Sequence, residues 1–310
     1  MTVNVLFAHN DVNWDVYKGT LEKALTDAGV PANLSRDLTP EEVDYIVYAP
    51  SSPLQDFTPY TRAKAVLSLW AGVETVTGNA TLNMPLARMV DFGLTQGMTE
   101  WVTGHVLRHH LDIDYTLRHQ DGDWLPRVPP LARSRRVSVL GLGALGSACA
   151  QALAGLGFPV SGWSRSPKQI DGVSCYSGDA GLKATLEQAD ILVLLLPFTP
   201  ATENVLNAES LSWMPQGACV INPGRGQLID DDALLDALDD GKIARATLDV
   251  FRVEPLPAEH AYWAHPNVTV TPHIASETRP ETASEVIAEN IRRGEAGEPF
   301  LHLVDRGLGY

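Results

Sequence analysis

Three segments in the second half of the chain place ionisable side chains after apolar runs. Arg225 follows the run ACVIN, Asp249 and Glu254 follow ARATL, and His273 follows NVTV. An imidazole can transfer a proton near neutral pH, a neighbouring carboxylate favours its charged form, and a guanidinium binds a carboxylate or a carbonyl. Singly, each has a structural alternative: a core histidine, a surface ion pair or a loop carboxylate. Open α/β sheets present ligand-facing groups at strand ends, so together these residues are candidates for one site.

A glycine-rich turn precedes these segments, with the spacing G-x-G-x-x-G at Gly141, Gly143 and Gly146. Such glycines allow a tight turn, close approach of the backbone to a pyrophosphate, and close packing of a helix on a strand. A strand pattern lies before the turn, a helical pattern after it, and a second strand ends about twenty residues later, which is the context of a dinucleotide site. We expect this turn, including Ala144 and Leu145, to bind a dinucleotide. A structural turn and the related loop of a methyltransferase are the alternatives.

The second strand of this unit ends in GWSRSPK, where an NAD site usually has an acidic residue. A carboxylate there accepts hydrogen bonds from the ribose 2′-hydroxyl and would repel a 2′-phosphate. Ser164 occupies the acid's position instead, and Arg165, Ser166 and Lys168 can surround a phosphate. The loop therefore predicts a preference for NADPH over NADH, with an exposed loop of no special function as the alternative.

Short β-branched runs alternate with helical patterns along the chain and provide the elements that must position these groups. VNVLFA, DYIVYA and KAVLSLWA come first, and RRVSVL, PVSGWS, DILVLLLP, ACVINP, ARATLDV and NVTVTP follow residue 135. Continuous apolar strands between helices indicate parallel sheets covered on both faces. The pattern predicts an α/β fold with two doubly wound parallel sheets.

The motifs N-x-x-R-G, D-V-F-x-x-E-P-L and T-P-H occur in the order typical of the D-2-hydroxyacid dehydrogenase family, which the chain resembles. GWSRSPK and the ending LVDRGLGY are similar to the glyoxylate/hydroxypyruvate reductase A branch of that family. The resemblance covers nearly the whole chain and is strongest over residues 137–276. It implies an NADPH-dependent reduction of small 2-oxo acids, glyoxylate or hydroxypyruvate, to 2-hydroxy acids by hydride transfer.

The resemblance also implies a role for each ionisable residue. His273 would give a proton to the carbonyl oxygen, Glu254 would orient and charge its ring, and Arg225 would bind the substrate carboxylate and carbonyl. Asp249 would contact the nicotinamide carboxamide, and Pro197 would lie among the coenzyme-binding residues.

The segment SLWAGVETV resembles the family's substrate loop, in which backbone amides near Gly72 and Val73 hold the substrate carboxylate. Ala71 belongs to the same loop, and glycine lets the backbone come close to a ligand. Trp70 stands where the branch is expected to carry a small residue. It would narrow the pocket, give it an apolar wall, or pack in the core. Tyr48 has two comparable interpretations, as a pocket residue or a core residue.

Composition and resemblance place the domain boundary differently. The proline-rich piece WLPRVPPLARS suggests a linker. The resemblance implies a flavodoxin-like substrate domain of residues 1–97 plus 280–310 and a Rossmann coenzyme domain of residues 98–279, with the active site in the cleft between them. The long helical pattern MTEWVTGHVLRHHLDIDYTLRHQ then belongs to the coenzyme domain, and a C-terminal helix returns to the first domain. Because family members are usually dimers through the coenzyme domain, we expect a homodimer.

Charge and composition exclude several classes of partner. The net charge of −15 and the absence of a Lys/Arg cluster disfavour nucleic acid. No apolar run approaches the roughly 20 residues that span a bilayer, and the N-terminal residues lack a signal-peptide pattern, so we expect a cytoplasmic protein. The three cysteines suggest neither disulfides nor zinc. His105 and His109 could share a helix face, but without a third ligand they predict no metal site.

Two alternatives to a reductase of small oxo acids remain. A reductase of the same fold with a bulkier substrate, such as phenylpyruvate, would suit Trp70. A dinucleotide-sensing protein similar to the family's corepressors would keep Arg225, Glu254 and His273 but turn over slowly. Formate dehydrogenase is disfavoured, because Glu254 stands where that enzyme carries an amide.

Overall fold

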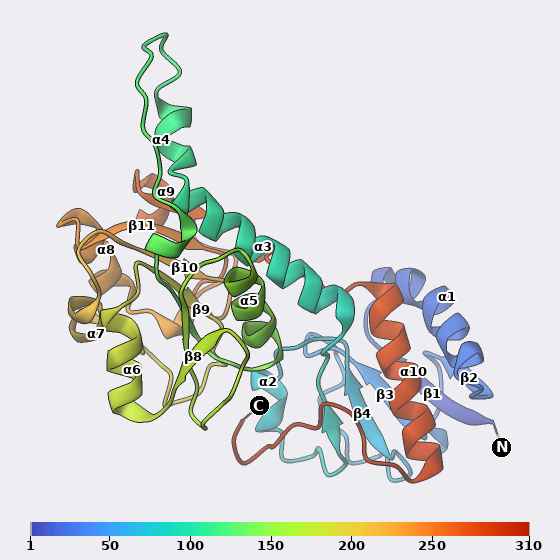
Figure 1. The fold of residues 1–310 in the computed structure, drawn as a ribbon. Helices are drawn as coiled ribbons and strands as arrows, with labels where there is room; N and C mark the ends of the chain where they lie inside the picture. Colours follow the sequence, from blue (N-terminus) through green and yellow to red (C-terminus); the bar gives the residue numbers. More distant parts are fainter. Residues whose placement is uncertain (1, 310) are drawn as a thin grey trace. The chain divides into compact units, whose positions relative to one another are not determined.

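The computed structural model describes residues 2–309, apart from the side chains of Asp11 and Val12. The chain divides into two compact units, Met1–Leu94 with Glu277–Tyr310, and Thr95–Ser276. The boundaries expected from the family lie three residues further along the chain, after residues 97 and 279. Each unit contains one parallel sheet, as the alternation of strands and helices predicts (Figure 1).

The first unit has a five-stranded sheet in the order β2-β1-β3-β4-β5. This is the order of a flavodoxin-like fold, which confirms the predicted class. Its elements are β1 (Val3–Ala8), α1 (Asp11–Asp27), β2 (Ala32–Ser35), β3 (Tyr45–Tyr48), β4 (Ala65–Ser68), α2 (Glu74–Thr77), β5 (Leu86–Ala87) and α10 (Pro280–Ala296).

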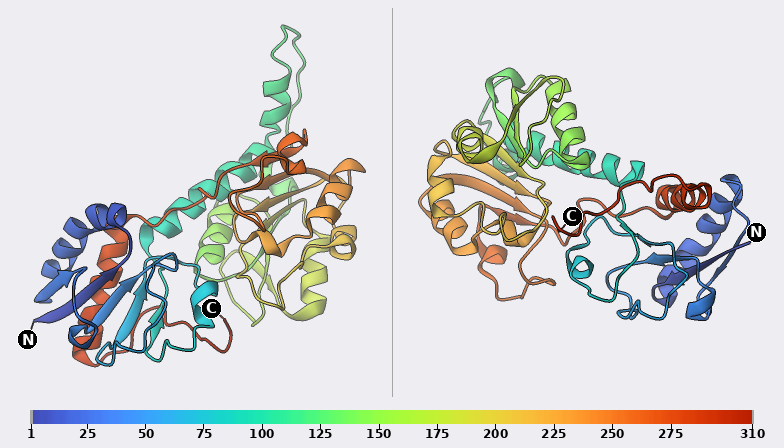
Figure 2. Two further views of the ribbon diagram at one scale, coloured as in Figure 1. Left: turned by 180° about the vertical axis from the view of Figure 1, so that it is seen from behind. Right: turned by 90° about the horizontal axis from the view of Figure 1, so that it is seen from below.

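Both faces of this sheet are covered, because alternate residues of a strand point to opposite sides. On β1, Val5 and Phe7 pack with α1 and α10, whereas Leu6 packs on the other side with Val73 and Val76 from the α2 region. Helices α1 and α10 lie side by side although they come from opposite ends of the chain (Figures 1 and 2).

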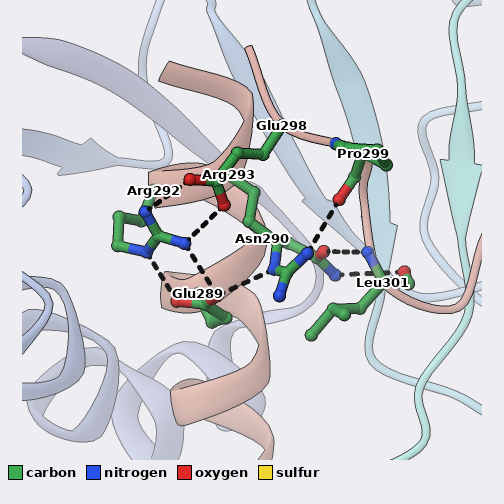
Figure 3. A network of polar contacts seen from close by, with 7 residues as sticks. All are labelled: Glu289, Asn290, Arg292, Arg293, Glu298, Pro299 and Leu301. Carbon is green, nitrogen blue, oxygen red and sulfur yellow. Dashed lines mark hydrogen bonds and ion pairs between the residues drawn. The ribbon is translucent and has the colours of Figure 1, made fainter. Parts of the chain in front are cut away.

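The chain after α10 is attached to that helix by polar contacts (Figure 3). Buried Asn290 accepts a hydrogen bond from the Leu301 amide at 2.7 Å, and Arg293 donates to the Pro299 carbonyl at 3.2 Å. Arg292 forms ion pairs with Glu289 and with Glu298. These contacts fix the direction of the C-terminal segment as it leaves the helix.

The second unit has a seven-stranded sheet in the order β12-β11-β10-β9-β6-β7-β8. Read from β6, this is the Rossmann order with one strand added at the β12 edge, so this part of the predicted fold is also confirmed. The strands are β6 (Val137–Leu140), β7 (Val160–Trp163), β8 (Val173–Tyr176), β9 (Ile191–Leu194), β10 (Ala218–Asn222), β11 (Ile243–Leu248) and β12 (Val268–Val270).

Helices cover both faces of this second sheet. One face packs against α3 and α5, and the other against α6, α7 and α8. The helices are α3 (Phe92–His110), α4 (Ile113–Arg118), α5 (Ala144–Gly155), α6 (Gly178–Glu187), α7 (Ala208–Trp213), α8 (Asp231–Asp239) and α9 (Ala261–Ala264).

The long helical pattern after residue 97 is two helices rather than one. It breaks between α3 and α4, because Asp112 has a left-handed backbone (φ 53°). The Asp112 carboxylate pairs with Arg245 at 2.5 Å and with Arg127 at 2.8 Å. The proline-rich piece that composition suggested as a linker lies inside this unit. With α4 it forms an arm, residues 111–131, that projects from the sheet and its helices (Figures 1 and 2).

Candidate active site

The glycine-rich turn lies between β6 and α5, at the point where the strand order of the second unit reverses. A Cβ at Gly141 (φ 104°) would lie 2.4 Å from the Leu195 carbonyl oxygen, and one at Gly146 would lie 1.7 Å from the Gly141 carbonyl oxygen. Only glycine fits at either position. At exposed Gly143, by contrast, a Cβ would meet no described atom within 4 Å.

Helix α5 begins directly after Gly143, and no side chain of the described residues caps it. Its first amides and the positive end of its dipole therefore face open space, which suits an anion. Ala144 is exposed and Leu145 is half-buried in this first turn. The turn thus has the geometry to hold the pyrophosphate of a dinucleotide.

The loop after β7 lies beside this turn, since the Gly141 amide donates to the Trp163 carbonyl at 2.8 Å. Ser164 is only 8% exposed, and its hydroxyl donates to the Ser166 carbonyl at 2.7 Å. Arg165, Ser166 and Lys168 are exposed. Ser164 therefore shapes the loop from within, while the neighbouring basic and hydroxyl groups face solvent.

Pro197 lies three residues after β9, the strand that neighbours β6. It is half-buried, and its carbonyl accepts a hydrogen bond from the Thr202 hydroxyl at 2.7 Å. The loop that contains Pro197 and the loop after β7 therefore follow the two strands on either side of β6, where the strand order reverses.

The three catalytic candidates come from neighbouring strands. β10, β11 and β12 run parallel, with Asn222 in register with Leu248 and Leu248 in register with Val270. The loops that follow these strands carry Arg225, Glu254 and His273 and start at the same edge of the sheet. The sequence interpretation expected this, because the carboxyl ends of parallel strands meet at one edge.

His273 and Glu254 form a direct pair. The His273 Nδ1 lies 2.8 Å from Glu254 Oε2, and the other carboxylate oxygen, Oε1, accepts from the Phe251 amide at 2.9 Å. An ionised carboxylate can only accept hydrogen bonds, so Nδ1 carries the hydrogen and Nε2 is the atom left to exchange a proton. Both side chains are exposed, and no residue of the described chain bonds to Nε2.

Arg225 is held in a folded loop after β10. Asn222 is nearly fully buried, accepts from the Gly224 amide at 3.1 Å and donates to the Arg225 carbonyl at 2.9 Å. A Cβ at Gly226 would lie 2.0 Å from the Phe251 carbonyl carbon, so this loop presses on the start of the loop that carries Glu254. The sequence interpretation did not single out Asn222. Its signal was an asparagine at a strand end before Pro-Gly, a pattern typical of turns.

Asp249 lies beneath the His273 segment rather than at the surface. It is 0% exposed, and its carboxylate accepts from the Thr271 hydroxyl at 2.6 Å and from the Ile274 and Ala275 amides at 2.9 Å each.

The substrate-loop candidates lie in the first unit, where Tyr48 is the last residue of β3 and Trp70, Ala71, Gly72 and Val73 follow β4. Tyr48 is in the core at 1% exposure, and its hydroxyl is 3.4 Å from Gln55 Nε2; burial raises the pKa of this hydroxyl. Trp70 is 44% exposed, so its indole is not a core side chain. Ala71 and Gly72 are half-buried, and Val73 is buried at the start of α2.

The two histidines considered as metal ligands have other neighbours. The His105 ring contacts the Trp101 ring in a tilted arrangement, with ring centroids 4.2 Å apart, and His109 Nε2 lies 3.0 Å from the Thr247 hydroxyl. Within residues 2–309 no cluster of three or more His, Cys, Asp or Glu side chains is arranged to hold a metal ion. Nor does any helix in that range have the length and apolar character needed to cross a membrane.

Comparison with known proteins links this geometry to one family. Residues 103–275 match the model of the D-isomer specific 2-hydroxyacid dehydrogenase NAD-binding domain. The chain is 39% identical to glyoxylate/hydroxypyruvate reductase A of Serratia proteamaculans and 37% identical to that of Yersinia enterocolitica, covering 99% of this chain and 100% of each relative.

Solved structures give the same result. A D-isomer specific 2-hydroxyacid dehydrogenase from Xanthobacter autotrophicus, in complex with NADPH and MES, has a TM-score of 0.92 and 42% identity over all of both chains. An NADPH-dependent glyoxylate/hydroxypyruvate reductase from Sinorhizobium meliloti, in complex with NADP and sulfate, has a TM-score of 0.86 and 35% identity over 100% of this chain and 99% of the other.

Proposed function

Because the chain belongs to the D-isomer specific 2-hydroxyacid dehydrogenase family, it is an NAD(P)-dependent oxidoreductase, and we propose that it reduces glyoxylate or hydroxypyruvate with NADPH. The pair of His273 and Glu254 is the observation that carries this proposal. It lies in the same unit as the glycine-rich turn, on strand-end loops of the sheet that also positions the turn. The names of the similar reductases support the choice of substrate.

The residues present suit the reduction of a 2-oxo acid. Bound NADPH would supply a hydride to the 2-oxo carbon. His273 Nε2 would give its proton to the carbonyl oxygen as that oxygen gains negative charge, and Glu254 would stabilise the imidazolium before transfer and hold the ring in place. Arg225 would pair with the substrate carboxylate and polarise the carbonyl. In the first unit, the backbone amides near Gly72 and Val73 would bind a substrate carboxylate.

The coenzyme preference is proposed from the loop after β7. Arg165 and Lys168 are exposed there, and no acidic side chain stands between Ser164 and Lys168 to repel a phosphate. A 2′-phosphate would be neutralised by these cations, whereas NADH carries no 2′-phosphate for them to bind. The two similar structures that contain NADPH or NADP support this preference.

A bulkier substrate is the second candidate, and Trp70 is the observation that favours it. An indole that is 44% exposed after β4 can form an apolar wall against a substrate side chain. Such a wall would suit phenylpyruvate better than glyoxylate.

One assay separates these proposals. We would follow the loss of nicotinamide absorbance with glyoxylate, hydroxypyruvate and phenylpyruvate, each with NADPH and with NADH. Rapid turnover of a small oxo acid with NADPH is the expected result. Preference for phenylpyruvate would support the second candidate, and preference for NADH would contradict the interpretation of the loop after β7. Tight NADPH binding without turnover of any substrate would favour a dinucleotide-sensing protein.

We also propose that two copies associate through the second unit. The arm carries large apolar side chains that are exposed, namely Leu111, Ile113, Leu117, Trp124, Leu125, Val128 and Leu131. Trp124 is 94% exposed. The ion pair of Asp112 with Arg245 attaches the base of the arm to β11, and its ion pair with Arg127 joins two parts of the arm. Burying the apolar side chains of the arm against a second copy would remove them from water.

The reaction is proposed to take place in the cytoplasm. The cysteines Cys149, Cys175 and Cys219 are all free, which is consistent with a reducing compartment.

A further inference from the structure

We propose that Asp249 is a positioning residue for His273, whose carboxylate shapes the segment 271–275 and thereby directs the imidazole. This inference rests on the proposed function. Asp249 directly follows β11, and the segment it binds directly follows β12, the neighbouring strand. Three hydrogen bonds join the carboxylate to this segment, one from a residue before His273 and two from residues after it.

The backbone at His273 needs this support. Its φ of 54° is in the left-handed region, which residues with a side chain rarely adopt. The His273 amide donates to the Asp249 carbonyl at 2.9 Å, so the backbone of Asp249 also holds the turn. The left-handed residue turns the next two amides, those of Ile274 and Ala275, toward the same carboxylate. Without that acceptor, two amide donors would lose their partner.

Both oxygens of the Asp249 carboxylate bond to the segment 271–275. Oδ1 already accepts from the Thr271 hydroxyl and the Ile274 amide, and Oδ2 accepts from the Ala275 amide. The residue is 0% exposed. The contacts of Asp249 thus join the two strand-end loops that carry Glu254 and His273, which keeps the Nδ1 of His273 within reach of Glu254.

Thr271 allows a test that leaves Asp249 itself in place. Thr271→Val removes the hydroxyl donor, and Thr271→Ser keeps it. We expect Thr271→Val to lower kcat by roughly tenfold, the size expected from losing a hydrogen bond to a charged group. The Kd for NADPH, measured by fluorescence titration, should stay within about twofold. Thr271→Ser should behave as the wild type.

Asp249→Asn should lower kcat further. The NH2 group of the new side chain would face a hydrogen-bond donor that now bonds to the carboxylate, such as the Ala275 amide. The double variant Asp249→Asn/Thr271→Val should be no slower than Asp249→Asn alone, since both changes act on one network. Thr185→Val is the matched control. Thr185 is buried on α6 and bonded to the Gly181 carbonyl at 2.8 Å, so its loss should affect stability without changing kcat.

A second readout does not depend on turnover. Protein labelled at histidine Cε1 gives one NMR signal per histidine, and the signal of His273 is assigned by its loss in His273→Asn. Its chemical shift should change in Thr271→Val and remain that of the wild type in Thr271→Ser. If the wild type reduces no oxo acid, the proposed function fails, yet this signal still tests the positioning role. An unchanged signal and unchanged kcat in Thr271→Val, with a raised Kd for NADPH in Asp249→Asn, would overturn the inference and assign Asp249 to the coenzyme.

Discussion

At the scale of single residues, the proposed chemistry depends on His273, whose ring pairs with the Glu254 carboxylate through Nδ1. Glu254 also accepts a hydrogen bond from the Phe251 amide, so both of its carboxylate oxygens have partners although the pair is exposed. An exposed pair is accessible to a substrate, and these hydrogen bonds favour one orientation of the ring for proton transfer.

This pair leads to the first prediction. Glu254→Gln keeps the size of the side chain but removes its charge, and should lower kcat by about 10²-fold, within the usual range for general acid–base catalysis. His273→Asn should lower kcat at least as much, and neither change should alter the Kd for NADPH. Steady-state assays and coenzyme titration check this. Glu259→Gln, an exposed carboxylate in the same loop, is the control. Equal kcat values for Glu254→Gln and wild type would remove Glu254 from the mechanism.

The basic loop leads to the second prediction. Arg165→Ala should raise the KM for NADPH by roughly tenfold or more and leave the KM for NADH nearly unchanged, because only NADPH has a 2′-phosphate to pair with the guanidinium. Lys183→Ala on α6 provides a control for the loss of one exposed positive charge. The comparison of both coenzymes in one steady-state assay measures the effect, and equal effects on the two KM values would contradict the phosphate role.

At the scale of elements, helix α3 packs on β11 through a buried histidine. His109 is 5% exposed, lies 3.0 Å from the Thr247 hydroxyl through Nε2, and has no partner for Nδ1 among the described residues. Burial lowers the pKa of His109 to about 3, assisted by Arg108, Arg245 and His105 and opposed by Asp114. The histidine is therefore neutral in the folded protein.

This pKa leads to a prediction on stability. In the unfolded chain a histidine titrates near pH 6.5, so the unfolded state binds the proton first as the pH falls. The stability that depends on neutral His109 is complete above about pH 6.5 and should fall by up to about 1.4 kcal/mol per pH unit toward pH 3. The free energy of unfolding, measured with urea between pH 7 and 5, should depend on pH less steeply in His109→Gln than in the wild type. The difference between the two slopes should correspond to about one bound proton.

Both proteins contain the other histidines, so the difference between the two slopes isolates His109. Thr185→Val, which leaves every histidine in place, serves as the control and should keep the wild-type slope. Parallel slopes for His109→Gln and wild type would mean that His109 binds a proton as readily in the folded state as in the unfolded state.

At the scale of the whole molecule, each unit buries both faces of a parallel sheet, whereas the arm of the second unit leaves its apolar side chains exposed. Monomeric proteins rarely expose so many large apolar side chains in one segment. The arm is therefore the segment through which association should be tested.

The arm leads to the last prediction. Light scattering after size exclusion should give the wild type twice the chain mass of 33.6 kDa. Leu117→Glu combined with Val128→Glu should give the monomer mass, since charges cannot be buried in an apolar interface without a large cost. Val16→Glu, which changes an exposed apolar residue on α1, should leave the dimer intact. A wild type of single-chain mass would contradict the dimer.

Much of the fold and of the candidate site follows from the sequence alone. Strand and helix periods, the glycine spacing and the polar residues at strand ends are local patterns, because apolar periodicity and backbone requirements act over neighbouring residues. They predicted both sheets, the turn at Gly141, and the edge that carries Arg225, Glu254 and His273.

Contacts between residues distant in sequence were decided only by the tertiary structure. Asp249 bonds to residues more than twenty positions away, and His109 of α3 lies beside Thr247 of β11. Asp112, where the helical pattern breaks before α4, pairs with Arg245, a residue of β11. A local pattern contains the side chains but not their partners, because hydrogen bonds and ion pairs require positions in space that the packing of strands sets.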